Sequence, residues 1–586
     1  MARLTGWNFW TVLYLTGIAA SYVLIRSSVS SEYVWAWSHL NTGLSGLTVL
    51  LVLGVVLLGL AVYGASRLDH TSLWTRIAQL CLALAVGVAT WYLRLDRSWG
   101  DRTIFLEMLT HSKAFRMSQP LTTAIYALVY RVVALWGWPP RNAIALVCSL
   151  AAGVSIDIIR RLLIRLPNSQ ALPTSLVLVS CSLTVLFFGY VETTVLALMM
   201  GLWFFLEARR YLADLQFLWR PALALGLAFA CHGLSVCFVP GLVFLAWQDG
   251  SHGITVRQRI RRGLGAAGVL VLPTLLIVIV ALLFPALIRG SLVGDSMGGE
   301  DMRPFVPLFT PQAEHERYTL FSVAHGLDLL NLAFLTSPLV LWILVSGFLA
   351  HKLLRKTGWG MFLGLNALAG WGVAFLWHPD LGMVRDWDLF APFMLPLLLL
   401  GGCVCGAVLK RPVLIAATLL SAINSALLLQ SFGPLAVWSP SVQALPVPAM
   451  YEHTDLVWNE EFELLGYDMA PAGSIPVGQP VELTLYFRGL EPMPVGYTVF
   501  LHLTDATGNV LAQDDRQPYP PTEYWPPGEV QSSTYAIQIP SDIQPQTWLE
   551  LRVGAYFWQT LERLPLTCDG QVIDSKATRL ASLLVE

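Results

Sequence analysis

Long apolar segments alternate with short polar ones along most of the chain. A helix that crosses a bilayer needs about 20 mostly apolar residues, and the pattern offers about eleven segments of that kind. They lie near residues 8–25, 43–65, 75–93, 142–159, 172–189, 191–208, 263–288, 332–350, 359–377, 391–409 and 412–431. The alternation predicts a polytopic α-helical membrane protein, with residues 8–25 retained as the first span.

Residues 121–137 are apolar but do not fit a simple span, because Arg131 lies near their middle. Treating them as a span would move the arginines at 160, 161 and 165 to the outer face. Basic residues tend to stay on the cytoplasmic side of a membrane. We therefore expect this segment to form an amphipathic helix in the outer interface.

Residues 222–247 are a second exception, since basic clusters lie on both of their flanks. Both flanks should be cytoplasmic, so we expect a re-entrant pair of half-length helices that turns at His232 and Gly233. Of the residues before 450, 18 of 30 basic but only 5 of 19 acidic side chains then fall in cytoplasmic loops. The remaining 14 carboxylates face outward, and the last span delivers the tail to the extracytoplasmic side.

The tail has a different pattern. Residues 432–450 are rich in proline and predict a short stiff linker. The runs VELTLYFRGL, YTVFLHLTD, STYAIQI and WLELRVGAYF then alternate apolar and polar positions, as half-buried strands do. We expect residues 451–586 to form an all-β sandwich, of the jelly-roll kind, outside the membrane.

Composition agrees with this division. The chain is 55% hydrophobic and only 13% charged, whereas soluble domains carry about a quarter charged residues. Seven of the eight cysteines lie in apolar segments, so neither a disulfide framework nor a cysteine metal motif is visible. There is no P-loop, dinucleotide fingerprint, zinc-protease motif or nucleophile elbow, which argues against an ATP-driven pump and a hydrolase. Nothing in the composition indicates a nucleic-acid partner.

The polar loop at residues 94–120 is the first candidate for chemistry. Asp101 follows a span closely, where a half-desolvated carboxylate could act as a general base on an acceptor hydroxyl; an ordinary solvated aspartate is the alternative. Asp96 lies between two arginines and is as consistent with an interfacial ion pair. Arg102 and Arg116 could hold a phosphate.

Glu192 lies in GYVETT, a tight turn between two predicted spans. It either begins a helix, where the dipole favours an anion, or belongs to the same pocket as Asp101. In the later outer loop HPDLGMVRDWD, Asp386 and Asp388 could ligate a divalent cation such as Mg²⁺ or Mn²⁺, and Arg385 could bind a phosphate. A mutually neutralising network is the alternative there.

Three further side chains have weaker signals. His325 and Asp328 fall on one face of a predicted helix, and His378 opens the HPDLGMVRDWD loop. We interpret these three as acceptor or loop support, with capping and packing as the alternative. His232, at the re-entrant turn, is either a buried structural histidine or a donor to a phosphate.

The order of these features resembles the GT-C superfamily of integral-membrane glycosyltransferases, in particular the protein O-mannosyltransferase and aminoarabinose transferase group. The segments that carry the resemblance are WGDRTIFLEML with SQPLTTAIYALVYR, and LALGLAFACHGLSVCFVPGLVF. The segments GYDMAPAGSIPVGQPVELTLYFRGL and WPPGEV resemble a β-sandwich appended to bacterial members. The chain departs from the family in two extra spans within residues 1–74, and in Ser118 and Gln119 where a histidine or lysine is common.

The resemblance implies a GT-C-like catalytic domain over residues 75–431 in a bacterial plasma membrane. It implies a hexosyl- or pentosyltransferase that moves a sugar from a polyprenyl-phosphate donor to an extracytoplasmic protein, lipid or glycan by inverting displacement. Asp101 and Glu192 would occupy the two acidic positions of the family, and no cofactor other than a divalent cation is expected. A lipid-linked sugar flippase and a glycan-binding membrane protein remain alternatives.

Overall fold

The computed structural model describes two units, within residues 1–436 and 437–586. The described residues are 46–68, 72–95, 105–106, 109, 116, 118–248, 255–283, 305–309, 319–338, 357–378, 383, 386–408, 411–432, 452–471, 475–491, 493, 496–518, 522, 525, 528, 530–557, 561–568 and 571–586. The predicted first span at 8–25 lies outside these residues. Each unit is treated separately below.

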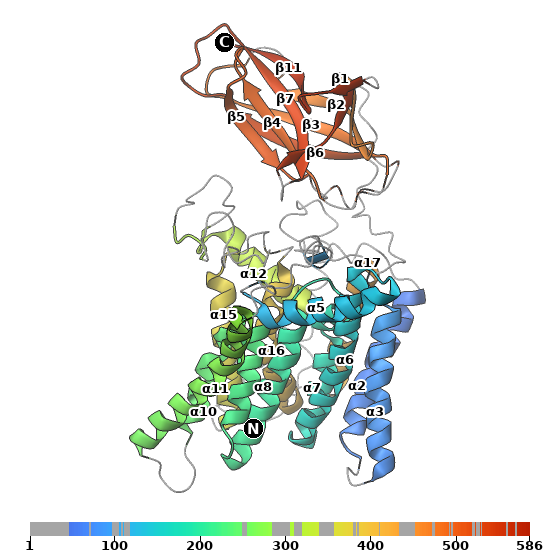
Figure 1. Cartoon of the computed structure of the whole chain (residues 1–586), viewed down its shortest axis with the longest axis vertical. Helices are drawn as coiled ribbons and strands as arrows, with labels where there is room; N and C mark the ends of the chain where they lie inside the picture. Colours follow the sequence, from blue (N-terminus) through green and yellow to red (C-terminus); the bar gives the residue numbers. More distant parts are fainter. Residues whose placement is uncertain are drawn as a thin grey trace. The chain divides into compact units, whose positions relative to one another are not determined.

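The first unit is a helical bundle (Figure 1). Its longer helices are α2 (Gly46–Ala65), α3 (Leu73–Tyr92), α6 (Pro140–Ile164), α8 (Thr194–Asp214), α11 (Val256–Leu283), α15 (Gly358–Leu376), α16 (Ala391–Val408) and α17 (Arg411–Phe432). Six helical segments of the described residues are long and apolar enough to cross a membrane: Gly46–Ala65, Leu73–Tyr92, Pro140–Ile164, Val256–Val280, Gly358–Leu376 and Trp387–Val404. These segments indicate a membrane protein, whereas the total of eleven spans and the sidedness remain predictions.

Helix α5 (Pro120–Val133) continues into the 3-10 helix η3 (Ala134–Trp136) and covers the segment expected to be interfacial. It lies across the upright helices instead of alongside them (Figure 1). Thr122 and Tyr126 are buried on its inner face, whereas Leu128 and Leu135 are exposed. Its direction and its two faces agree with an amphipathic helix at an interface.

The helical pair at residues 219–247 turns where the sequence predicts. Helix α9 (Trp219–Cys231) ends just before His232, and η5 (Gly233–Phe238) and α10 (Val239–Trp247) return. A Cβ built on Gly358 would lie 3.6 Å from Leu212, near the end of α8, and 3.8 Å from Gln248, just after α10. The pair therefore begins and ends at the same end of the bundle.

The prediction of one continuous span over residues 172–189 is wrong. Helix α7 (Asn168–Ser180) stops at Cys181, whose backbone is extended, and η4 (Ser182–Phe187) follows. A break of this kind leaves carbonyls that need other donors in apolar surroundings. Here the Ser180 carbonyl accepts from Ser421 Oγ (3.0 Å) and Ser425 Oγ (2.7 Å) of α17.

The helix expected to begin at residue 332 also begins at a different residue in the structure. Helix α12 (Val323–Thr336) starts nine residues earlier and ends at Thr336; residues 339–350 lie outside the described part. Ser322 Oγ caps it by accepting from the His325 backbone N–H (3.3 Å). The helical face that was expected to carry His325 and Asp328 is present.

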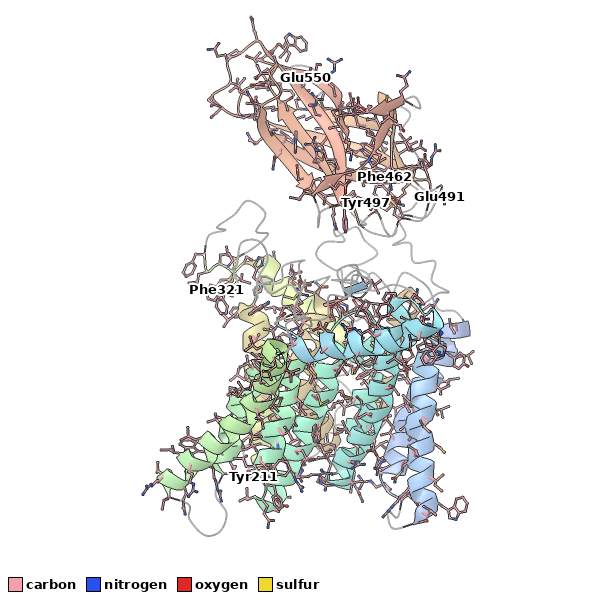
Figure 2. All side chains as sticks on the ribbon, viewed as in Figure 1. Tyr211, Phe321, Phe462, Glu491, Tyr497 and Glu550 are labelled. Atoms are coloured by element: carbon pink, nitrogen blue, oxygen red, sulfur yellow. The ribbon has the colours of Figure 1, made fainter. Side chains whose placement is uncertain are left out.

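Basic residues gather at one end of the bundle, where α2, α6 and α8 finish. Arg67 donates to the carbonyl of Leu163 (3.2 Å), and Arg209 donates to that of Arg165 (3.0 Å). Tyr211 marks this end in Figure 2, and Phe321, just before α12, lies at the opposite end. The arginines expected to be cytoplasmic thus lie together, away from α5.

The second unit consists of two antiparallel sheets with strand orders β10-β9-β1-β2-β3-β6 and β11-β7-β4-β5, and β8 pairs with β7. The strands are β1 (Glu452–Trp458), β2 (Phe462–Ala470), β3 (Pro480–Gly489), β4 (Thr498–Thr504), β5 (Val510–Arg516), β6 (Val530–Gln538), β7 (Thr547–Phe557), β8 (Glu562–Arg563), β9 (Leu566–Cys568), β10 (Gln571–Ile573) and β11 (Ala577–Val585). Inward residues of both sheets, such as Leu485 and Leu551, share one core. The predicted all-β sandwich is therefore observed.

Candidate functional site

The turn between η4 and α8 buries a carboxylate. Tyr190 and Glu192 are 0% and 7% exposed, and the Glu192 backbone N–H donates to the Tyr190 carbonyl (2.9 Å). The turn ends where α8 begins at Thr194. Because a helix N-terminus stabilises negative charge, this position explains how a carboxylate can be buried here.

A second buried carboxylate meets this turn from a distant part of the chain. Asp388 lies in η7 (Trp387–Phe390), directly before α16, and is 3% exposed. Thr194 Oγ1 donates to Asp388 Oδ2 (3.3 Å), and Trp387 Nε1 donates to the Tyr190 hydroxyl (3.0 Å). The structure thus brings Glu192 and Asp388, which the sequence placed in separate loops, to the same place.

Helix α5 holds the turn through one of its faces. The Tyr126 hydroxyl donates to the Glu192 carbonyl (2.7 Å). Burial is the main reason that the pKa of Tyr126 lies well above its usual range, and the Cys148 thiol and the Glu192 charge add to it. Tyr126 therefore remains a hydrogen-bond donor at physiological pH. One turn earlier, Thr122 Oγ1 donates to the Cys231 carbonyl (3.0 Å) at the end of α9.

Two of the predicted phosphate-binding residues meet beside α5. The Gly233 backbone N–H donates to the Ser118 carbonyl (2.9 Å), which brings the tip of the helical pair to the segment before α5. His232, 5% exposed, is close enough to Arg116 for the guanidinium charge to act on its ring. Arg116 itself lies over the Phe105 ring, with its Cζ 5.6 Å from the ring centroid.

The His232 ring has a defined proton position. Its Nδ1 accepts from the Leu234 backbone N–H (3.4 Å), so in the neutral ring the proton is on Nε2. Nε2 is buried and has no hydrogen-bond partner among the residues that the structure describes. A buried donor without a partner is costly, so this N–H is available for an anionic or carbonyl group that enters the site.

The three residues expected to support the acceptor or the loop lie on α12 and after α15. His325 is 0% exposed, and its Nε2 donates to the Phe375 carbonyl (3.0 Å) near the end of α15. Burial is the main reason that the pKa of His325 is lowered, and the hydrogen bond to the Phe375 carbonyl partly offsets it. Asp328 is half-buried on the same helix. These contacts join α12 to α15, and a role in acceptor binding remains a prediction.

Four predicted site residues, Asp96, Asp101, Arg102 and Arg385, lie outside the described residues. Within the described part, no group of three or more His, Cys, Asp or Glu side chains is arranged to hold a metal ion. Asp386 is half-buried and its carbonyl accepts from the Leu389 N–H (3.0 Å). Asp386 and Asp388 as metal ligands therefore remain a prediction.

Several residues of the site have no clear signal in the sequence. Tyr126, Tyr190, Thr194 and Trp387 are common types in apolar segments, where packing is the default interpretation. Only the hydrogen bonds that they make to the carboxylate segments distinguish them. The sequence offers one usable signal, which is a polar side chain on the inner face of the helix expected at the interface. This signal indicates Thr122 and Tyr126.

Comparison with known proteins assigns no family. No protein-family model matches the chain, and no curated protein matches it. Among solved structures, the Archaeoglobus fulgidus oligosaccharyltransferase, tethered to an acceptor peptide, aligns at 12% identity over 61% of this chain and 55% of its own, with a TM-score of 0.33. A Pseudomonas fluorescens alkylpurine DNA glycosylase bound to DNA aligns at 12% identity over 84% of this chain and 100% of its own, with a TM-score of 0.13. Scores this low support no argument about fold or activity.

The fold and the candidate site themselves define the class of protein. It is a helical membrane protein with a β-sandwich that follows α17 in the chain. Within the described residues, the bundle buries the carboxylates of Glu192 and Asp388, and a histidine N–H without a partner there.

Proposed function

We propose that this protein is a membrane glycosyltransferase that moves a sugar from a polyprenyl-phosphate carrier to an extracytoplasmic acceptor. Two observations support the proposal. The turn that carries Glu192 is bonded both to α5, through Tyr126, and to Asp388, through Thr194. His232 lies near Arg116, just before α5. Sequence resemblance to GT-C enzymes supplies the reaction type. Carboxylates next to a phosphate-binding pair are what this reaction needs.

The proposed step is a single displacement. The acceptor hydroxyl loses its proton to a carboxylate, with Asp101 as first choice and Asp96 as second, and its oxygen bonds to the anomeric carbon. The bond from that carbon to the phosphate oxygen breaks, and the lipid phosphate leaves as an anion. Inversion at the anomeric carbon follows from this geometry.

The described residues have matching roles in this proposal. His232 Nε2–H and the Arg116 guanidinium would stabilise the departing phosphate, together with Arg102 and Arg385. Glu192 would orient the acceptor or the sugar. Its backbone is fixed by Tyr126 and by its own turn, so its side chain would be presented from a rigid element, as orientation requires.

The test uses membranes that express the full chain and a panel of radiolabelled polyprenyl-phosphate sugars. We expect transfer from one donor, and its loss in Asp101→Asn and Glu192→Gln. The matched control is Asp214→Asn, because Asp214 is an exposed carboxylate at the end of α8, away from α5. Absence of transfer with every donor, from protein that is folded and monodisperse, would reject the proposal in favour of transport of a lipid-linked sugar.

A further inference from the structure

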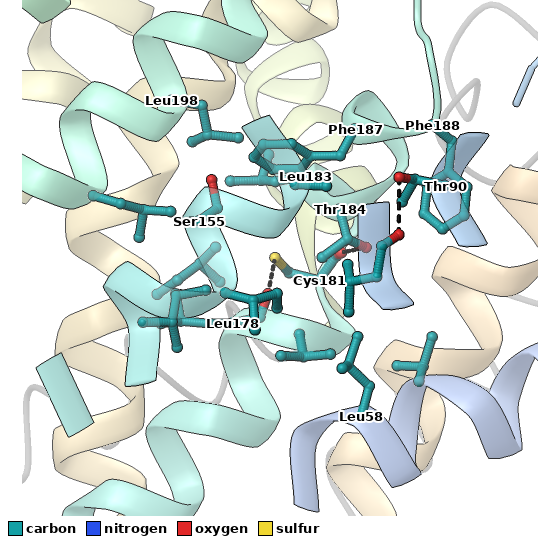
Figure 3. Close-up of a pocket in the computed structure, with 18 of the residues that line it drawn as sticks. Leu58, Thr90, Ser155, Leu178, Cys181, Leu183, Thr184, Phe187, Phe188 and Leu198 are labelled. Carbon is teal, nitrogen blue, oxygen red and sulfur yellow. Dashed lines mark hydrogen bonds between the residues drawn. The ribbon is translucent and has the colours of Figure 1, made fainter. Parts of the chain in front are cut away.

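A partly open apolar cavity of about 100 Å³ lies between helices α2 and α3 on one side and α6, α7, α8 and α16 on the other. Val55 of α2 and Val86 of α3 form one side. Ile156 of α6 and Leu178 of α7 form the other, with Leu198 of α8 behind them. Figure 3 shows the side chains of these elements around the space.

The cavity exists because α2 and α3 pack on different partners. Helix α2 packs mainly against α7 and α17, whereas α3 packs mainly against α6. Close approach is possible on both sides because of glycines: a Cβ at Gly59 would lie 3.0 Å from Leu176, and one at Gly153 would lie 2.7 Å from the Ala83 carbonyl. The helices are thus anchored separately, and a space remains between them.

The lining offers almost no polar contacts. Thr90 Oγ1 donates to the Val86 carbonyl (3.0 Å), and Thr184 Oγ1 donates to the Cys181 carbonyl (2.8 Å), so both hydroxyls are satisfied internally. Ser155 contributes the one lining hydroxyl that has no partner among the described residues. Apolar cavities of this kind exclude water and accept apolar guests.

The outer faces of α2 and α3 indicate which apolar molecule is available to fill the cavity. Leu53 and Leu57 of α2, and Leu80 and Leu84 of α3, are exposed apolar side chains on candidate membrane spans. In a bilayer these faces contact lipid chains. A space lined by two such helices therefore lies next to the hydrocarbon of the bilayer.

We propose that this cavity holds the end of an acyl chain from a phospholipid of the surrounding bilayer. The chain would pack against Leu178 and Leu183, on both sides of the break at Cys181. Restoring dispersion contacts there stabilises the 3-10 segment. That segment leads directly into the turn that carries Glu192, although the lipid site does not depend on the proposed sugar transfer.

The test places the full chain in nanodiscs of phosphatidylglycerol that carries a diazirine at the acyl terminus, followed by irradiation and peptide mapping. We expect label within residues 178–184, which are mostly buried, well above the background in the buried segment 204–206 of α8. Label in 178–184 no higher than in 204–206 would overturn the proposal.

Variants on α6 test the site directly. Ala152→Phe fills the cavity from its lining and should reduce the label in 178–184 to background. Leu150→Phe is the matched control, because Leu150 is 61% exposed and does not line the cavity. If Ala152→Phe does not fold, Val179→Phe fills the space from α7. Label that persists in a folded filling variant would contradict the proposal.

Two further arms separate the acyl chain from other occupants. Ser155→Ala should leave the label unchanged, whereas a loss of label would assign a polar ligand held by the hydroxyl. Excess unlabelled phosphatidylglycerol should compete. Competition by polyprenyl phosphate alone would assign the cavity to an isoprenoid chain and overturn the phospholipid assignment.

Discussion

The hydrogen bond from Tyr126 to the Glu192 carbonyl gives the sharpest test of how the site is held together. The hydroxyl and the carbonyl oxygen are 2.7 Å apart, and Tyr126 is 1% exposed. Tyr126→Phe removes only the hydroxyl, so the ring continues to fill its space. The effect of the change is therefore that of losing the hydroxyl, whose partners are the Glu192 carbonyl and the Cys148 thiol.

The expected magnitude follows from the environment of the bond. A typical protein hydrogen bond contributes about 0.5–1.5 kcal/mol, and a buried group that loses its partner costs about 1–3 kcal/mol. Because both groups are buried, we expect Tyr126→Phe to lower the free energy of unfolding by about 1–3 kcal/mol. If the same bond positions Glu192 for the reaction, about 1.4 kcal/mol of lost positioning would slow transfer roughly tenfold.

The assay is thermal unfolding of the full chain in detergent or nanodiscs, together with hydrogen exchange in the segment 189–194. Tyr130→Phe is the matched control, since Tyr130 is one turn away on the same helix and only partly buried. We expect faster exchange in the Tyr126 variant alone. Equal melting temperatures and equal exchange in both variants would refute the idea that α5 fixes the turn.

Two other predictions concern packing and pH. Gly226→Ala should destabilise the bundle by about 1–3 kcal/mol, because the new Cβ would lie 2.3 Å from the Leu270 carbonyl. Gly263→Ala on α11, with nothing within 4 Å, should instead stabilise by up to about 1 kcal/mol in the same melting assay, because alanine favours the helix. Hydrogen bonds from Thr507 and Asn509 lower the pKa of Asp505 from 3.8 to about 2. The ionised carboxylate therefore stabilises the turn before β5 above about pH 4, and this contribution is lost as the pH falls through about 2. Hydrogen exchange in residues 504–510, corrected for intrinsic rate, should show that loss in the wild type and little pH dependence in Asp505→Asn.

The local sequence pattern predicted the helices well where the surroundings of a residue are set by its neighbours in sequence. The helices α2, α3, α6, α15 and α17 lie close to the segments expected from hydropathy. The position of Arg131 argued against an upright span in this segment, and the structure has α5 lying across the bundle instead. Basic flanks gave the helical pair, and even its turn at His232, because charge placement constrains both ends of such a segment.

The hydropathy pattern did not predict the structure where a distant segment determines the local backbone. The sequence of residues 172–189 does not predict the break at Cys181. The hydroxyls that donate to the Ser180 carbonyl belong to Ser421 and Ser425, more than two hundred residues away. Helical propensity is a weak preference that tertiary contacts override. Residues 332–350 misled for a different reason: hydropathy placed the start of the helix, whereas the local cap Ser322 begins α12 nine residues earlier.

By itself, the sequence determined the class of protein, the β-sandwich after the helices and a short list of candidate carboxylates and cations. These follow from hydropathy, strand alternation and charge, which are properties of neighbouring residues. Only the tertiary structure decided which of the candidates meet. Asp388 is bonded to Thr194, two residues after Glu192, and the Gly233–Ser118 contact brings His232 near Arg116. Packing of the bundle joins these segments, which no local pattern connects.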